Sequence, residues 1–217
     1  MISDRLIDYS VTKREEIFEG YVMNLRRDTF DYQGEDLTRE YIVHPGAVGI
    51  IALDHEGKIL LVEQYRHAQG KIMWEPPAGL LDAPDEDPLE CAKRELLEET
   101  GYVASKWQVL IDFANTPGGS SEQIRLYFAQ GLTLHIDGRP EAGEEERDMP
   151  VHWIPVSEVL ASIGQGLVTN AALTVGTLAL VTALAEPDVM LRDANSPWPA
   201  RQDVLGNDRV RLPKAKG

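Results

Sequence analysis

The feature that most constrains this chain is a helix predicted at residues 88–100, whose last turn is crowded with carboxylates. The helix begins at a proline, which the first helical position accepts, and ends at Gly101, a residue type that commonly terminates helices. Glu95, Glu98 and Glu99 share one face, because side chains three or four positions apart are neighbours. Acidic groups at this negative end of the helix dipole cost about 0.3–1 kcal/mol each. We therefore weigh a site for a hard cation such as Mg²⁺ or Mn²⁺ against a merely solvated acidic face.

Net charge and cysteine content limit the partners and the cellular compartment that we expect for this chain. With 217 residues and a formal net charge of −15, it can build one domain plus an appendage, and its surface repels nucleic acid. The only cysteine, Cys91, excludes an intrachain disulfide and is expected to be a small buried residue. The first ten residues lack the apolar run of a secretory signal, and the apolar segment 171–184 is too short to span a bilayer. We expect a cytoplasmic protein with no membrane partner.

Apolar periodicity predicts a chain rich in strands, with helices between and after them. The expected strands are residues 17–22, 28–32, 48–53, 58–64, 106–113, 123–130 and 150–155. Besides the acidic helix, helices are expected at residues 157–164 and 170–185. Turns are expected at Gly20 and Gly34, and the turn at residues 54–57 predicts a hairpin at the centre of a mixed sheet. The tail from Met190 is locally basic and is expected to be extended or partly disordered.

The acidic helix and the loop before it resemble the Nudix box. That box is written G-x5-E-x7-R-E-U-x-E-E-x-G-U, where U is apolar, and the match is complete from Glu86 through Arg94 and Gly101 to Tyr102. The departure is at the front, where six residues instead of five separate Gly79 from Glu86. A match of this length favours the cation site. The resemblance implies an α/β (α+β) fold, the Nudix α/β/α sandwich with a mixed sheet, here preceded by a small N-terminal antiparallel β region.

The resemblance also implies roles for the residues of the box. Divalent cations would be held by Glu95, Glu98, Glu99 and the backbone carbonyl of Ala78. The structural residues of the box would be Gly79, Glu86, Arg94 and Gly101, with an ion pair between Arg94 and Glu86 fastening the loop to the helix. Bound cations neutralise phosphate oxygens, orient a water and lower its pKa. Mg²⁺ is the expected cofactor, with Mn²⁺ as a substitute.

Segments outside the box resemble the ADP-ribose pyrophosphatase branch of the family. They are Glu63-Gln64-Tyr65-Arg66, Trp74-Glu75-Pro76-Pro77-Ala78-Gly79, Pro117-Gly118-Gly119-Ser120-Ser121-Glu122 and His44-Pro45-Gly46-Ala47-Val48. The residues expected to bind substrate are Arg66, Tyr65, Trp74, Gly118 and Glu122. A guanidinium suits a phosphate or ribose contact, although Arg66 would also pair with surface carboxylates. Trp74 in the core and Glu122 on the plain surface are the open alternatives.

An acidic loop at residues 141–148 is expected to supply the general base. In the branch this base is a loop glutamate shortly before an Asp-apolar-x-Val strand start, which here is Asp148-Met149-Pro150-Val151. Alignment on Asp148 selects Glu145, with Glu144 and Glu146 one residue away as alternatives. The expected catalytic set is Glu145, Glu99, Glu98 and Glu95. The loop would have to approach the attacking water to act.

The resemblance implies hydrolysis of the diphosphate bond of ADP-ribose to AMP and ribose 5-phosphate. The domains are expected to be an N-terminal β region and dimerisation element at 1–42, a Nudix hydrolase domain at 43–186 and a basic tail at 187–217. Related enzymes are homodimers whose N-terminal strands help to bind adenine, so a homodimer is expected. The alternatives are a Nudix hydrolase of another nucleotide sugar or dinucleotide, an enzyme that removes oxidised nucleotides, and a non-catalytic nucleotide-binding module. The complete set of box carboxylates disfavours the last.

Overall fold

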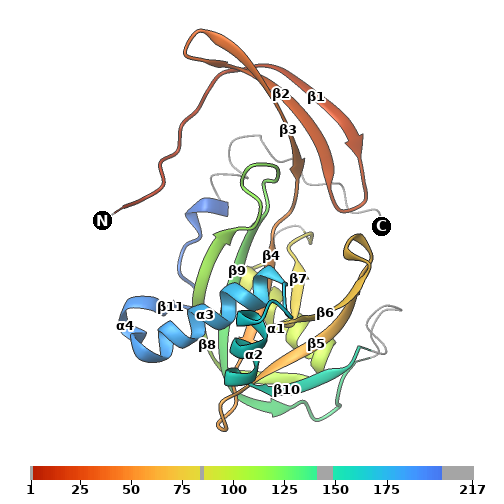
Figure 1. The fold of residues 1–217 in the computed structure, drawn as a ribbon, viewed down its shortest axis with the longest axis vertical. Helices are drawn as coiled ribbons and strands as arrows, with labels where there is room; N and C mark the ends of the chain where they lie inside the picture. Colours follow the sequence, from red (N-terminus) through yellow and green to blue (C-terminus); the bar gives the residue numbers. More distant parts are fainter. Residues whose placement is uncertain (1, 84–85, 141–148, 202–217) are drawn as a thin grey trace. The chain divides into compact units, whose positions relative to one another are not determined.

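The computed structural model describes residues 2–83, 86–140 and 149–201 of the chain, which divide into two compact units. Within these residues, the first unit comprises 2–46, 114–123 and 198–201. The second unit comprises the remainder, from residue 47 to 197, and contains all the helices of eight or more residues (Figure 1).

The first unit is built on a three-stranded antiparallel sheet in the order β1-β2-β3. Its strands are β1 (Val11–Glu19), β2 (Asn24–Tyr32) and β3 (Glu35–Val43). The predicted turn at Gly34 is confirmed, with Gln33 and Gly34 both at positive φ, as a tight hairpin requires. The predicted strand over 17–22 is wrong in its second half, because β1 ends at Glu19 and the Gly20 amide donates to the Met23 carbonyl in a turn. Most of β1 is exposed on both faces, so no alternating apolar pattern marks its true extent.

The segment 114–123 is joined to β3 by backbone hydrogen bonds within the first unit. The Ile42 amide donates to the Gly119 carbonyl at 2.9 Å, and the Ser121 amide donates to the Ile42 carbonyl at 2.9 Å. The Ser121 hydroxyl accepts a further bond from the His44 amide at 2.9 Å. These bonds hold the Pro117-Gly118-Gly119 turn beside the end of the N-terminal sheet.

The second unit contains a five-stranded mixed sheet and a three-stranded antiparallel sheet. The five-stranded sheet has the order β11-β8-β9-β4-β7, in which β4 and β9 are parallel, whereas β11 with β8 and β4 with β7 are antiparallel. Its strands are β4 (Ala47–Ala52), β7 (Ala78–Leu80), β8 (Tyr102–Ala114), β9 (Gln123–Leu134) and β11 (Arg192–Asp193). The smaller sheet, in the order β10-β5-β6, consists of β5 (Lys58–Arg66), β6 (Lys71–Glu75) and β10 (Val151–Pro155). The short helix η1 (His67–Gln69) connects β5 to β6. The expected mixed sheet is confirmed.

The expected hairpin at the centre of one sheet is wrong. The turn after β4 forms as predicted, with the Asp54 amide donating to the Lys58 carbonyl, but only Leu53 and Ile59 are bridged beyond it. The two strands then part, and each enters a different sheet. The strand β4 is almost completely buried and β5 is buried over residues 59–62, and Ile51, Leu53, Ile59 and Leu61 belong to one core cluster. Strands that separate in this way bury apolar side chains between two sheets, which a single flat hairpin cannot do.

Among its described residues, the second unit contains four α-helices, of which α1 (Pro88–Thr100) and α3 (Ala171–Ala185) pack on strands of the five-stranded sheet. The other two are α2 (Val156–Gly164) and α4 (Pro187–Met190). The helix α3 packs on β4 so closely that a Cβ added to Gly176 would lie 2.5 Å from Ile51 Cδ1. The helix α1 contacts β4 and β7, and the boundaries predicted for all three longer helices agree with the structure to within one residue. No helix among the described residues is long and apolar enough to cross a membrane.

The C-terminal segment is attached to the second unit as far as Pro197. After α4, β11 pairs with β8, and the guanidinium of Arg125 donates to the carbonyls of Ser196 and Pro197 at 2.8 and 3.1 Å. The segment from Met190 was expected to be extended or partly disordered, and its described part includes the short strand β11 with contacts to β8 and Arg125. Residues 202–217 lie outside the described residues.

Candidate active site

The acidic helix forms for the reasons that its sequence suggests. The carboxylate of Asp87 caps α1 by accepting from the Leu89 amide at 2.8 Å, and Pro88 occupies the first helical position. Gly101 ends the helix at φ 75°, and its amide donates to the Leu97 carbonyl at 2.8 Å. The last turn contains no basic residue. Its negative charge must therefore be balanced by groups from elsewhere in the chain or by a bound cation.

The three expected metal ligands differ in burial. Glu95 and Glu99 are 7% and 4% exposed, whereas the Glu98 side chain is 35% exposed. Glu99 Oε2 accepts a hydrogen bond from the Ala78 amide at 3.0 Å, which ties the helix to the strand before the box. Buried carboxylates require partners, and this bond supplies one for Glu99.

Gly79 is the point at which the chain passes closest to the carboxylate face. Its Cα lies against the carboxyl group of Glu95, with no room for a side chain between them. The glycine at the front of the box is therefore required by a close approach, and the extra residue in the loop after it does not disturb this contact.

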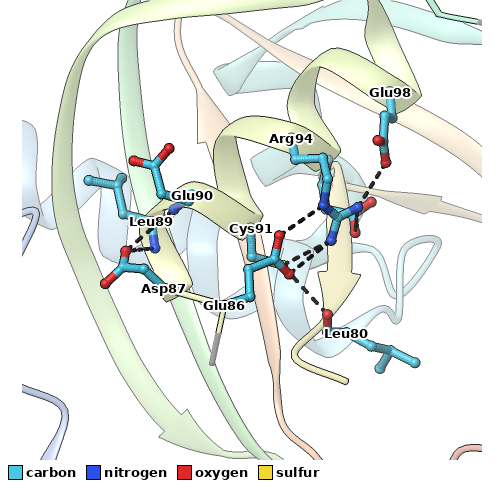
Figure 2. Close-up of polar contacts among 9 residues, drawn as sticks. Leu80, Glu86, Asp87, Leu89, Glu90, Cys91, Arg94 and Glu98 are labelled. Carbon is cyan, nitrogen blue, oxygen red and sulfur yellow. Dashed lines mark hydrogen bonds and ion pairs between the residues drawn. The ribbon is translucent and has the colours of Figure 1, made fainter. Parts of the chain in front are cut away.

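Arg94 contacts three acidic groups, two of which, Glu86 and Glu98, are labelled beside it in Figure 2. Its guanidinium donates to both carboxylate oxygens of Glu86, at 2.9 and 3.2 Å, and to Glu98 Oε2 at 2.8 Å. The same side chain lies 2.8 Å from Glu95 Oε1. The hydrogen bond from Arg94 lowers the pKa of Glu86, and the bond to Glu86 is the main cause that raises the pKa of Arg94. The expected pairing of Arg94 with Glu86 is present, and it extends to two of the expected ligands.

Cys91 is fully buried beneath this network, as expected for a structural residue. Burial, followed by the nearby carboxylates Glu86 and Glu95, raises the pKa of its thiol to about 12. The thiol is therefore protonated at neutral pH and donates to the Leu80 carbonyl at 3.5 Å.

The donor set on α1 fits a hard divalent cation. Carboxylate oxygens are the ligands that Mg²⁺ and Mn²⁺ favour, and Glu95, Glu98 and Glu99 leave the same end of one helix. In the described part of the chain, however, no three acidic, histidine or cysteine side chains converge as a ready-made ion cluster. Arg94 and the Ala78 amide each bond one carboxylate oxygen, Glu98 Oε2 and Glu99 Oε2. A carboxylate has about four acceptor sites on its two oxygens, so these bonds do not exclude coordination of a cation by the same side chains.

The residues expected to bind substrate before the box lie on the smaller sheet. Arg66 donates twice to Glu75, at 2.9 and 2.6 Å, while 45% of its side chain remains exposed. Tyr65 is exposed, and its hydroxyl lies 3.1 Å from His67 Nδ1. The alternative that Arg66 pairs with a carboxylate is thus what the structure shows, although that carboxylate is buried.

Trp74 lies partly in the core and partly against a histidine. It packs against the core cluster and lines a cavity of about 130 Å³ with Leu61 and Leu173. Its ring centroid is 4.9 Å from that of His152, whose Nε2 is 2.9 Å from a Glu63 oxygen. The distance is that of an ion pair, but the geometry is not that of a hydrogen bond.

Gly118 and Glu122 belong to the first unit. Gly118 lines a cavity of about 530 Å³ whose wall includes Tyr9, Phe30, Arg39 and Tyr41. Glu122 does not line that cavity.

Glu122 is instead held by two neighbours of its own unit. Its Oε2 accepts from Asn115 Nδ2 at 2.9 Å, and its Oε1 lies 3.7 Å from His44 Nε2. Burial lowers the pKa of His44, and Glu122 partly opposes that shift. His44 Nδ1 accepts from the Gly46 amide at 3.1 Å, so its proton is on Nε2, facing Glu122.

Glu145, with Glu144 and Glu146, lies outside the described residues, as does the rest of the acidic segment 141–148. In the sequence, the described residues on either side of it are Pro140 and Met149.

Two groups near the expected site were not predicted from the sequence. Glu75 is 3% exposed and holds Arg66, but it gave no signal beyond its place in a motif. Arg139 donates to the Glu98 carbonyl at 2.9 Å, and its neighbours Gly138 and Pro140 indicate only a turn. Both act through contacts with residues distant in sequence, which periodicity and spacing do not reveal.

Comparison with known proteins agrees with this arrangement. The NUDIX domain family model matches residues 43–170. The chain is 43% identical over 207 residues to the ADP-ribose pyrophosphatase of Mycobacterium tuberculosis, which covers 94% of this chain and 97% of that protein. It is 31% identical over 170 residues to the GDP-mannose pyrophosphatase of Yersinia pestis, covering 71% and 83% of the two chains. A crystal structure of an ADP compounds hydrolase superimposes with a TM-score of 0.70 at 18% identity, covering 85% of this chain and 98% of that one, which shows a common fold.

The family model covers more than half of the chain, and its range contains the complete carboxylate face of α1 with Gly79, Glu86 and Arg94. This protein belongs to the Nudix family.

Proposed function

We propose that this protein hydrolyses ADP-ribose to AMP and ribose 5-phosphate. The observation that carries the proposal is the identity of 43% to an ADP-ribose pyrophosphatase over nearly the full length of both chains. The same alignment length includes the N-terminal sheet, so the similarity is not confined to residues that bind any diphosphate. The carboxylates Glu95, Glu98 and Glu99 would supply the chemistry.

The helix glutamates would hold Mg²⁺, or Mn²⁺ in its place, with the Ala78 carbonyl as a further ligand. Such cations supply neutralisation of diphosphate oxygens and activation of water. Glu99 is fixed for this role by the Ala78 amide, and Glu95 is fixed by its contact with Gly79. Arg94 keeps the carboxylates from repelling one another and holds the loop before the helix through Glu86.

In the proposed reaction, a water oxygen forms a bond to one phosphorus of the diphosphate, and the bridging P–O bond breaks. The water proton passes to Glu145, and the second phosphate leaves with the electrons of the broken bond. Glu144 and Glu146 are the alternatives for this base. Replacing each of the three in turn by Gln identifies the base as the one whose loss lowers kcat most.

Arg66, Tyr65 and Trp74 are proposed to bind substrate from the smaller sheet. The guanidinium of Arg66 is held in a fixed orientation by Glu75 while nearly half of the side chain remains accessible. In the first unit, the cavity lined by Gly118, Tyr41 and Arg39 is of a size suited to a nucleoside. Glu122 is proposed to position His44 and Asn115 in the same unit.

We also propose a homodimer in which the N-terminal unit, residues 1–42, is the dimerisation element. Exposed apolar side chains gather around the turn between β1 and β2. They are Ile17, Phe18, Tyr21, Val22 and Met23. Exposed apolar patches of this kind mark association surfaces. Sedimentation of the wild type beside Phe18→Ser and Tyr21→Ser tests the proposal, because both substitutions should shift a dimer toward monomer.

The test of the activity is release of AMP from ADP-ribose with about 5–10 mM Mg²⁺. Wild type should be active, and Glu99→Gln should lose about 100-fold or more in kcat, since even residues behind a ligand cost about 10–100-fold. A glutamine at position 99 still accepts the Ala78 amide, so the helix should stay in place. Glu90→Gln is the matched control, because Glu90 is an exposed residue of the first turn that pairs with Lys93.

The second candidate substrate is another nucleotide sugar, and the similarity to the GDP-mannose pyrophosphatase favours including GDP-mannose in the assay. Turnover of GDP-mannose without turnover of ADP-ribose would keep the mechanism and exclude the proposed substrate. Absence of turnover with every nucleoside diphosphate derivative would favour a binding module.

A further inference from the structure

Arg139 brings a cation from outside α1 to the carbonyl end of this helix. The last turn of α1 contains acidic residues and no basic residue. Arg139 Nε donates to the backbone carbonyl of Glu98 at 2.9 Å. Glu98 is among the last residues of the helix, whose carbonyls have no partner within it, and a cation is favoured at this negative end. With one contact, Arg139 therefore satisfies the Glu98 carbonyl and adds a positive charge at the negative end of the helix dipole.

Arg139 is itself held against the same turn by its backbone. The His135 amide, at the end of the strand β9, donates to the Gly101 carbonyl at 2.9 Å. A Cβ on Gly101 would lie 3.1 Å from the Arg139 nitrogen and 3.3 Å from its Cβ. The glycine that ends the box thus leaves the space in which Arg139 lies. Two independent contacts place this arginine on the last turn of α1.

A second nitrogen of the Arg139 guanidinium contacts the segment just before β10. Arg139 NH1 donates to the Met149 carbonyl at 3.1 Å, and Met149 is 6% exposed. The Glu63 amide donates to the neighbouring Pro150 carbonyl at 3.2 Å, where β10 begins to pair with β5. One guanidinium therefore joins the helix that carries Glu98 and Glu99 to the smaller sheet.

We propose that Arg139 is a positioning residue for the cation site, acting through the Glu98 carbonyl. It sets where the last turn of α1, with the carboxylates of Glu98 and Glu99, lies relative to the start of β10. Arg139 thereby contributes to cation affinity, although it has no carboxylate and lies outside the box. The link of Arg139 to catalysis rests on the proposed function, whereas its contacts with α1 and Met149 do not depend on it.

The direction in which loss of Arg139 shifts the cation dissociation constant distinguishes a role in charge from a role in positioning. A positive charge beside a cation site weakens cation binding by electrostatic repulsion, so removing the charge alone should tighten it. Removing a group that positions the ligands should weaken binding instead, by about tenfold, as loss of residues behind metal ligands does. The two roles of Arg139 therefore predict opposite shifts of the same dissociation constant.

The experiment is a titration of the full-length protein with Mn²⁺, followed by electron paramagnetic resonance of the free ion. Wild type, Arg139→Gln and Arg139→Lys are compared, with thermal unfolding measured for each. Arg139→Gln should bind Mn²⁺ about tenfold more weakly. Arg139→Lys, which keeps the charge and one donor, should recover part of the loss.

The matched control is Arg125→Lys. Arg125 also holds two backbone carbonyls, those of Ser196 and Pro197, but none on α1. It should lower the unfolding temperature without changing Mn²⁺ affinity, which separates positioning from general loss of stability. Should Arg139→Gln fail to fold, Arg139→Lys against Arg125→Lys carries the same comparison.

Unchanged or tighter Mn²⁺ binding by Arg139→Gln, or by Arg139→Lys if only that variant folds, would overturn the inference whatever the activity does. A wild type that fails to cleave ADP-ribose, together with weakened Mn²⁺ binding in the variant, would overturn the proposed function and leave the inference standing. In an active enzyme, kcat of Arg139→Gln should fall with the Mn²⁺ affinity while KM for ADP-ribose changes less than about twofold, because the variant leaves uniform substrate binding intact.

Discussion

The carboxyl group of Glu95 lies so close to Gly79 that a Cβ built on the glycine would be 2.1 Å from its Cδ. Gly79 is the first residue of the box and Glu95 lies on the helix that ends it, so this contact brings the two ends of the motif together. The carboxylate is 7% exposed, and it has little freedom to move away.

Gly79→Ala should therefore displace Glu95 and damage the carboxylate face. We expect a loss of stability of about 1–3 kcal/mol, as for other overpacked sites, and weaker Mn²⁺ binding. Urea unfolding and Mn²⁺ titration measure the two effects. Gly164→Ala is the control, because an added Cβ there meets nothing within 4 Å. Equal behaviour of the two variants would contradict the role given to Gly79.

The pair of Glu86 and Arg94 should make stability depend on pH in the acid range. The hydrogen bond from Arg94 lowers the pKa of Glu86 below its ordinary value of 4.5. A carboxyl with a lowered folded pKa stabilises the protein above its unfolded pKa, and that contribution disappears as pH falls through the folded value.

Glu86→Gln should accordingly be less stable than wild type at pH 7, by at most about 1 kcal/mol for a partly exposed pair. The difference should stay constant down to about pH 5 and shrink below pH 4.5. Denaturant unfolding at a series of pH values gives both curves. A difference that stays the same into the acid range would show that the ion pair contributes nothing through ionisation.

His44 should resist protonation in the folded protein. Burial lowers its pKa from 6.5, and its Nδ1 is already an acceptor for the Gly46 amide. The unfolded chain therefore binds a proton at a pH where the folded chain does not, so stability falls as pH drops from about 6.5 toward the folded pKa.

His44→Gln should remove this part of the pH dependence while leaving the rest of the curve unchanged. The ring proton signals of His44 in the wild type, followed by NMR, should titrate below 6.5, the ordinary value for the pKa of histidine. A midpoint at or above 6.5 would mean that Glu122 outweighs burial.

The helices were predictable because each has local signals that agree with its packing. Asp87, Pro88 and Gly101 cap α1 as their types predict. The acidic last turn alone left a cation site and a solvated face open, and the resemblance to the Nudix box favoured the cation site. The paths of β4 and β5 were not predictable, because two buried strands joined by a tight turn have the same sequence pattern in one sheet or in two.

The contact partners of the site residues were also not predictable from the sequence. Arg66 was predicted to bind substrate from its place in a motif, but its paired hydrogen bonds to Glu75 depend on the cross-strand register of β5 and β6. The same holds for the C-terminal segment, whose prolines and basic residues suggested an extended chain. Its attachment depends on Arg125, a residue some seventy positions away.

Arg125 should be the residue on which the attachment of the C-terminal segment depends. It is 3% exposed, donates to both oxygens of Asp112 at 2.7 and 2.9 Å, and holds the Ser196 and Pro197 carbonyls. Arg125→Gln leaves Asp112 with only Arg192 and leaves two carbonyls without their donor. Removing one partner of a buried pair costs about 3–5 kcal/mol.

Arg192→Gln is the matched comparison, since Arg192 also contacts Asp112 at 2.9 Å but is 41% exposed. It should cost less than about 1 kcal/mol, because an exposed pair is weakened by solvent. Denaturant unfolding of both variants measures the difference, and limited proteolysis should release the segment after Met190 faster in Arg125→Gln than in Arg192→Gln. Similar losses in the two variants would mean that β11, and not the buried guanidinium, holds the segment in place.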